Sequence, residues 1–246
     1  MSDLLRGYRD RVVAILDHVA TSQSDAFTAV RDAVATALAA DKLIYVAGSG
    51  HSHLIAEEAF FRAGGIAAAQ AILDPDLMLH VSASNSSKVE RETGRAEKVL
   101  ANYSIVPGDI VFVVSNSGRN AYPIETALAA KARGAVTVAL TSLRHSQRVT
   151  SRHPSGKRLF EVCDLVLDNG ADYGDAGLPV GSHGLLMGPT STITGVFLIN
   201  AVIAEAVDQL ARRGIAVDVY QSANSQDGEA AADEIVRRWQ PRIKGL

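Results

Sequence analysis

The chain has 246 residues, of which 47% are hydrophobic and 21% are charged, an ordinary composition for a globular protein with a full core. A formal net charge of −3, without a basic stripe carrying interleaved aromatic residues, argues against nucleic acid as a partner. A single cysteine, Cys163, excludes an internal disulfide and a cysteine-rich zinc site, and its apolar surroundings favour a buried thiol over a nucleophile. The first residues are too charged for a secretory signal, and no apolar run approaches about 18 residues, so we expect a cytoplasmic protein with no membrane association.

Two helices are predicted ahead of the first strand. Apolar residues recur at helical spacing over residues 4–40, and a Thr-Ser-Gln-Ser-Asp segment at 21–25 supplies the turn between the two helices. Such a leading pair covers its own sheet or packs against another subunit, and the pattern is compatible with both.

The first predicted strand, residues 43–47, runs into a Gly-Ser-Gly-His-Ser turn at 48–52 and then a helix over 54–62. The turn lacks the Gly-Lys-Ser/Thr ending of a nucleotide-binding loop and the Gly-x-Gly-x-x-Gly spacing of a dinucleotide fold. Glycine-rich turns offer backbone N–H groups to anions, so we interpret this turn as one half of a phosphate site. The helix carries the adjacent carboxylates Glu57 and Glu58, which either reach solvent or belong to a functional site.

A short second strand is predicted over residues 66–73, and a polar segment over 74–92 follows it. This segment is longer than a normal connection between a strand and a helix, and loops of that length are usually functional or mobile. A helix over 93–103 and a Pro-Gly turn lead into the next strand.

The strand predicted over residues 110–114 ends in the string Ser115-Asn116-Ser117-Gly118, and a helix follows Asn120. In open α/β sheets, ligands bind outside the carboxyl ends of the strands. Two hydroxyls, several backbone donors and a glycine suit a phosphate, although an ordinary polar turn that only caps the helix explains the same residues.

Two more strands complete the pattern, at 136–140 and 165–167, and the first of them ends at Thr141 and Ser142. A basic stretch over 143–160 faces either an anion or only water. A Gly- and Pro-rich stretch over 171–189 contains His183 and precedes a long apolar helix over 196–210. The length and apolar character of that helix indicate burial under the sheet or at a subunit interface. A last helix is predicted over 229–239.

The alternation of strands and helices predicts an α/β protein, a three-layer αβα sandwich around a five-stranded, mostly parallel sheet of flavodoxin-like type. The chain shows no internal linker, so we expect one domain over residues 1–246. It divides into N-terminal helices at 1–40, an αβα core at 41–215 and a C-terminal tail and helix at 216–246.

Three of these motifs, in this order, resemble the SIS (sugar isomerase) domain family of phosphosugar-binding proteins. Residues 115–118 resemble the family's Ser-x-Ser-Gly phosphate loop, with Asn120 where threonine is common. Residues 48–52 resemble the first Gly/Ser turn of phosphoheptose and arabinose-5-phosphate isomerases, and residues 188–192 resemble the start of the last long helix of the latter. The whole chain is similar to bacterial phosphoheptose-isomerase-like SIS proteins that have no assigned substrate.

The resemblance implies a sugar phosphate as the small-molecule partner, held by the strand-to-helix turns. The residues predicted to bind it are Ser49, Gly50, Ser52, Ser115, Asn116, Ser117, Asn120 and Ser142. The base of phosphoheptose isomerases resembles the second Glu of an Ala-Glu-Glu string, which predicts Glu58 as the base, although the string lies four residues nearer to the turn here. His183 is the predicted acid, with His51 and His53 as alternatives, because carboxylate and histidine suit proton transfer next to a carbonyl.

We therefore predict an aldose–ketose sugar-phosphate isomerase that works as a homodimer or homotetramer without a cofactor. No metal is predicted. A metal site formed by His51 and His53 with Glu57 or Glu58 stays an alternative. SIS domains also serve as non-catalytic phosphosugar sensors in regulators and as phosphosugar lyases or etherases, and these remain alternatives because the fold does not determine the reaction.

Overall fold

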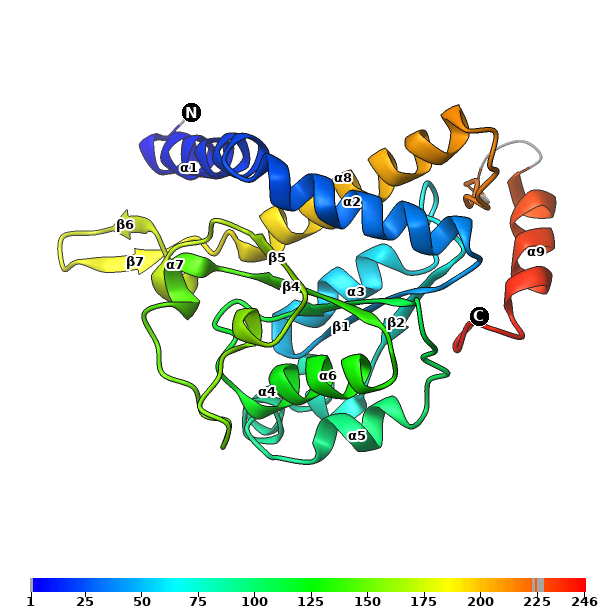
Figure 1. Cartoon of the computed structure of the whole chain (residues 1–246). Coiled ribbons are helices and arrows are strands. Elements are labelled where there is room, and N and C mark those ends of the chain that lie inside the picture. The colour runs from blue at the N-terminus through cyan, green and yellow to red at the C-terminus, as the bar shows by residue number, and fades with distance from the viewer. Residues whose placement is uncertain (1, 223, 225–227) are drawn as a thin grey trace.

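The computed structural model describes residues 2–222, 224 and 228–246. A five-stranded parallel sheet with the order β2-β1-β3-β4-β5 lies at its centre (Figure 1). The strands are β1 (Ile44–Gly48), β2 (Ala69–Ile72), β3 (Ile110–Val114), β4 (Val136–Thr141) and β5 (Leu165–Asp168). The predicted fold class, including the two leading helices, is confirmed.

The central strands are apolar along their whole length because helices cover both faces of the sheet. Every residue of β1, β2 and β3 is buried, as expected for parallel strands covered on both sides. The chain leaves β1 toward β2 and leaves β3 toward β4, in opposite directions along the sheet. The crevice between the carboxyl ends of β1 and β3 is therefore the switch point at which ligands bind in folds of this order.

Two helical layers flank the sheet (Figure 1). One layer contains α1 (Asp3–Thr21), α2 (Ser24–Ala39), α3 (His53–Ala59) and α8 (Ser191–Arg212); the other contains α4 (Leu79–Val89), α5 (Arg95–Leu100) and α6 (Ala121–Ala132). The remaining helices are α7 (Leu143–Ser146), after β4, and α9 (Gly228–Trp239), near the C-terminus.

The long helix α8 packs along α2 and α3. Its length and composition would allow it to cross a membrane, but one side of it is buried in the protein core, including Leu198, Ile199 and Val202. Close packing depends on Gly195, where an added Cβ would lie 2.4 Å from Cδ1 of Ile55. Two alternatives were predicted for this helix, burial under the sheet and burial at a subunit interface. The first is confirmed for the side of α8 that carries these buried residues.

The prediction of a long loop over residues 74–92 was wrong, because most of this segment is helical. Asp74 caps a short 3-10 turn, Pro75–Leu77, by accepting a hydrogen bond from the backbone N–H of Asp76 (3.3 Å), and α4 follows. Few side chains of this segment are buried, among them Leu77 and Val89, which is why its polar sequence lacks a helical period.

Other boundaries shift by a few residues. Helix α3 ends at Ala59 instead of residue 62, because Phe60 adopts extended backbone angles and Phe61 has a positive φ of 41°. Helix α5 is shorter than the predicted 93–103, starting after Gly94 in the left-handed region. The Gly-rich stretch before α8 forms an antiparallel hairpin, β6 (Leu178–Val180) and β7 (Leu185–Met187), for which no strands were predicted.

The single cysteine is expected to react slowly in the folded protein. Burial raises the pKa of the Cys163 thiol to about 12. At pH 8 its thiolate fraction then falls roughly 1,000-fold below that of a free cysteine, and the rate of modification by Ellman's reagent falls with it. Guanidinium-unfolded protein is the control and should react at the ordinary rate. Equal rates for the folded and unfolded chains would contradict the buried-thiol interpretation.

Candidate phosphosugar site

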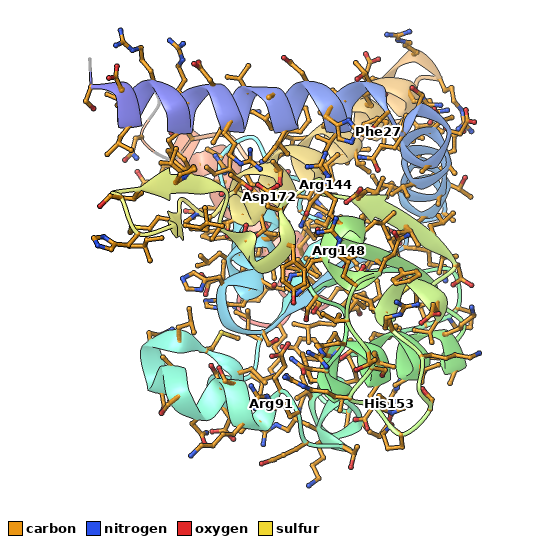
Figure 2. All side chains as sticks on the ribbon, turned by 90° about the vertical axis from the view of Figure 1, so that its left-hand side faces the viewer. Phe27, Arg91, Arg144, Arg148, His153 and Asp172 are labelled. Carbon is orange, nitrogen blue, oxygen red and sulfur yellow. The ribbon has the colours of Figure 1, made fainter. Side chains whose placement is uncertain are left out.

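The turns that follow β3, β4 and β5 are tied together at the carboxyl edge of the sheet, the end of the molecule seen in Figure 2. The backbone carbonyl of Asn116 accepts hydrogen bonds from the N–H of Ser142 (3.2 Å) and the hydroxyl of Thr141 (3.3 Å). The side-chain oxygen of Asn116 accepts from Nδ2 of Asn169 (3.1 Å). The loop after β3 is therefore held in place from its β4 side before any ligand binds.

The loop after β3 carries two serine hydroxyl groups. Ser115 is buried, and its Oγ accepts a hydrogen bond from the backbone N–H of Gly118 (3.2 Å). Gly118 has a positive φ of 57°, a backbone conformation that favours glycine because it has no Cβ. The carbonyl of Gly118 accepts a hydrogen bond from the N–H of Leu159 (2.8 Å). Among the described residues, the Ser117 hydroxyl has no hydrogen-bond partner and the Ser115 proton has no acceptor. Both O–H groups can donate to an anion.

The loop after β1 turns sharply against its own backbone. A Cβ at Gly48 would lie 2.5 Å from the carbonyl carbon and oxygen of Ser52, so this position requires glycine. Gly50 has a positive φ of 56°, and the N–H of Ser52 donates to the carbonyl of Ser49 (3.0 Å). Ser49 is buried and Ser52 is half-buried. The tight turn brings this pair of serines to the carboxyl end of β1, beside β3.

Asn120 and Glu90 lie between the loop after β3 and the loop after β1. Nδ2 of Asn120 donates to Oε2 of Glu90 (2.8 Å), and Oδ1 of Asn120 accepts from Nη1 of Arg152 (3.0 Å). Ser49 lies close to the Glu90 carboxylate. Burial raises the pKa of Glu90, while the neighbouring Ser49 and Asn120 side chains and the charges of Arg91 and Arg152 partly oppose that shift. Glu90 was not predicted from sequence because it lies within the polar segment that was expected to be a loop.

Positive charge accumulates at this edge. Within the described ranges, Arg91, Arg119 and Arg152 form no ion pair, whereas most other arginines do. Burial lowers the pKa of Arg152, and the positive charges of the neighbouring Arg119 and Arg91 lower it further by repulsion. An anion bound at this edge would relieve that repulsion.

Three of the predicted ligands already have side-chain partners in the protein. The Ser142 hydroxyl is buried, donates to the carbonyl of Ala171 (2.6 Å) and accepts from the N–H of His145 (3.1 Å). The Asn116 side chain is engaged by Asn169, and the Asn120 side chain by Glu90 and Arg152, as described above. The other predicted ligands at this edge are Ser49, Gly50, Ser52, Ser115 and Ser117. Whether each of them contacts a ligand remains a prediction.

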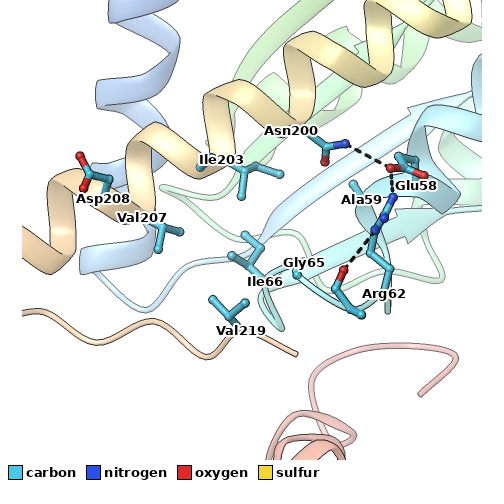
Figure 3. A pocket seen from close by; sticks show the side chains of 13 residues that line it. Glu58, Ala59, Arg62, Gly65, Ile66, Asn200, Ile203, Val207, Asp208 and Val219 are labelled. Carbon is cyan, nitrogen blue, oxygen red and sulfur yellow. Dashed lines mark hydrogen bonds and ion pairs between the residues drawn. The ribbon is translucent and has the colours of Figure 1, made fainter. Parts of the chain in front are cut away.

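The predicted base and acid lie elsewhere. Glu58 is near the other end of α3, in a pocket of about 540 Å³ between α3, α8 and the segment around Val219 (Figure 3). Its carboxylate pairs with Arg62 and accepts a hydrogen bond from Nδ2 of Asn200 (3.1 Å). His183 is exposed at the turn of the β6–β7 hairpin. The described contacts connect neither residue to the switch point, and their roles remain predictions.

The two histidines of the first turn differ in their surroundings. His51 is exposed, whereas His53 is buried, with Nδ1 in contact with the carbonyl oxygen of Gly50 and Nε2 3.9 Å from Oε2 of Glu57. Across the part of the chain that the structure describes, no group of three or more His, Cys, Asp or Glu side chains is arranged to hold a metal ion.

The doubly wound sheet, with serine-rich loops after β1 and β3, places the protein in the class of α/β proteins that bind ligands at the carboxyl ends of their strands. The model of the SIS domain family matches residues 7–142, more than half of the chain, and the protein belongs to this family. Among its relatives, it is 41% identical to a UPF0309 protein of Halalkalibacterium halodurans over 225 residues, 92% of this chain and 93% of that protein. A UPF0309 protein of Listeria monocytogenes serotype 4b is 38% identical over 240 residues, 98% of this chain and 97% of that protein.

Solved structures share the fold at low sequence identity. A phosphoheptose isomerase from Francisella tularensis aligns with a TM-score of 0.52 and 16% identity, over 85% of this chain and 100% of that one. The Vibrio vulnificus NanR protein complexed with ManNAc-6P aligns with a TM-score of 0.51 and 16% identity, over 100% of this chain and 72% of that one. At this sequence identity, both alignments show a common fold and nothing more specific.

Proposed function

We propose that the protein binds a sugar phosphate at the switch point between β1 and β3 and interconverts its aldose and ketose forms. The observation that carries this proposal is the loop after β3. It is fixed by Asn169 and Thr141, yet it leaves the Ser115 and Ser117 O–H groups free to donate. Arg91, Arg119 and Arg152, which have no ion-pair partner within the described residues, add positive charge at the same edge.

A phosphate is the anion that suits this arrangement. Its oxygens accept several hydrogen bonds at once, and both the hydroxyls and the N-terminus of α6, a helix of 12 residues that begins directly after Asn120, favour bound negative charge. Because the phosphate is remote from the carbonyl of a sugar phosphate, its binding energy can align the reacting carbons without taking part in the reaction. Support also comes from the shared fold of a phosphoheptose isomerase and of NanR complexed with ManNAc-6P.

The proposal includes a homodimer or homotetramer. Three consecutive apolar side chains of the β6–β7 hairpin, Leu185, Leu186 and Met187, are 58%, 50% and 54% exposed. Ile193 and Phe197, near the start of α8, are also exposed. Apolar surface of this kind favours association, which supports a second copy of the chain as its cover.

A thermal-shift screen with pentose, hexose, heptose and amino-sugar phosphates tests the binding step. A ligand at 100 times its dissociation constant stabilises the folded state by about 2.7 kcal/mol, and we expect such a shift from at least one phosphosugar and none from the matching free sugar. Turnover of that phosphosugar then separates the isomerase from a non-catalytic sensing or regulatory module, which would bind without reaction. If no phosphosugar stabilises the protein, the proposal fails.

A further inference from the structure

Glu90 occupies the place where the two halves of the switch point meet. Its backbone carbonyl accepts a hydrogen bond from the N–H of Tyr122 (3.0 Å), which pins the end of α4 to the first turn of α6. Its side chain accepts a hydrogen bond from Asn120 in the loop after β3 (2.8 Å) and lies close to Ser49 in the loop after β1. A ligand that spans these two loops, as ligands do in this fold, therefore comes into contact with the Glu90 carboxyl group.

The surroundings of Glu90 allow it to hold or release a proton. Burial is the largest influence and raises its pKa above the ordinary range for glutamate. The charged groups that face it are Arg91, its neighbour on α4, and Arg152, which reaches it from the segment after α7; both favour the ionised form. Within the described residues, Glu90 forms no ion pair, so no directly paired basic side chain holds its carboxylate in the ionised form. A dianionic phosphate nearby would raise the pKa further.

Glu58, the carboxylate predicted from sequence, has the opposite surroundings. Arg62 pairs with it directly, and Asn200 donates a further hydrogen bond. Both partners contact Oε1 of the carboxylate, so this oxygen is already engaged within the protein. Its pocket is lined by apolar residues of α8 such as Ile203 and Val207 and does not include the serine loops (Figure 3).

We infer that Glu90 is a catalytic residue of this protein, the acid–base group that moves a proton between the two carbons of the bound sugar phosphate. The inference rests on the proposed function and assigns its central step. In the aldose-to-ketose direction, the Glu90 carboxylate takes the proton from C2, and the electron pair of that C–H bond forms a C1–C2 double bond while the O1 oxygen takes up a proton. The Glu90 carboxylic acid then returns its proton to C1, and the C2 hydroxyl releases one proton as the ketone forms. Uptake at O1 and release from O2 balance, and no oxidant is needed.

The test compares three single variants of the full-length protein with the wild type. Glu90→Gln keeps the size of the side chain and an oxygen that accepts from Asn120, but it cannot titrate. Glu92→Gln is the matched control, because Glu92 is exposed and makes no side-chain hydrogen bond or ion pair within the described ranges. Glu58→Gln tests the competing assignment. Each variant is mixed in D₂O with the sugar phosphates that stabilise the wild type, and proton NMR follows the replacement of the C2 proton by deuterium.

We expect Glu90→Gln to bind the sugar phosphate with an unchanged thermal shift and to exchange the C2 proton at least about 100-fold more slowly. Glu92→Gln and Glu58→Gln should exchange at the wild-type rate. In wild type the exchange rate should fall as pH drops through the pKa of Glu90, because the protonated acid is no longer a base, and the residual exchange of Glu90→Gln should lack that fall.

Other results would overturn the inference in distinguishable ways. Wild-type exchange by Glu90→Gln removes Glu90 from the reaction and leaves the proposed function standing. Loss of ligand binding together with exchange assigns Glu90 to binding only. Slow exchange confined to Glu58→Gln identifies Glu58 as the base. A wild type that binds a sugar phosphate but exchanges no C2 proton with any of them removes the isomerase itself, and with it the role of Glu90.

Discussion

Replacing both Ser115 and Ser117 by alanine is expected to weaken sugar-phosphate binding by about 100-fold or more while the protein stays folded. Each hydroxyl is free to donate to a phosphate, and a hydrogen bond to a charged group is worth about 1.5–3 kcal/mol. Two of them give about 3–6 kcal/mol, or roughly 10²–10⁴ in the dissociation constant. Isothermal titration calorimetry with the phosphosugar that stabilises wild type measures this change.

The matched control is Ser104→Ala. Ser104 is exposed, makes no side-chain hydrogen bond within the described residues, and precedes β3, whereas Ser115 and Ser117 follow it. This variant should bind like wild type. Circular dichroism spectra of the double variant should also match those of wild type. Among the described residues, the only side-chain hydrogen bond that the double variant loses is the one from the Gly118 N–H to Ser115. Unchanged affinity of the double variant would show that the ligand lies elsewhere.

Replacing Asp109 by alanine is expected to cost about 1.5–4.5 kcal/mol of folding free energy. Asp109 is 1% exposed, and its two carboxylate oxygens accept hydrogen bonds from the backbone N–H groups of Leu43 (2.9 Å) and Val106 (2.8 Å). Removing the carboxylate leaves the buried N–H of Leu43 without a partner, which costs about 1–3 kcal/mol, and removes the part-buried hydrogen bond of Val106, worth about 0.5–1.5 kcal/mol. Urea unfolding measures the loss as a lower midpoint.

The variant Asp109→Asn separates this hydrogen bonding from simple loss of volume. Its side chain fits the same space but has one acceptor oxygen, so it should retain one of the two bonds and lose about half as much stability. Asp109 lies at the amino end of β3, opposite Ser115, so ligand affinity of the folded variants should not change. An unchanged urea midpoint for Asp109→Ala would show that the two N–H groups find other partners.

The local patterns of this sequence are sufficient for the strands and for the turns that follow them. Runs such as residues 110–114 are apolar throughout, and parallel strands require this because both faces are covered. Glycine and serine after a strand reflect a backbone constraint that acts within a few residues, as the close approach of Gly48 to Ser52 shows. The serine loops and the αβα class were therefore predictable from neighbouring residues alone.

Contacts between distant segments were not predictable in the same way. The segment that became α4 has few apolar residues because little of it is buried, so no period marks it as a helix. Glu90 is 30 residues from Asn120 in sequence, and their side chains meet only because the fold places the end of α4 beside the first turn of α6, where the N–H of Tyr122 donates to the carbonyl of Glu90. Conversely, Glu58 matched a family string in sequence, yet the early end of α3 leaves it beside Arg62 and Asn200.

The sequence by itself thus determined the class of fold and the glycine- and serine-rich turns that follow its strands, because these follow from burial and backbone geometry over short stretches. The tertiary structure alone decided the strand order and the switch point between β1 and β3. It also decided which carboxylate stands at that point, since the protonation of Glu90 depends on burial and on partners that are distant along the chain.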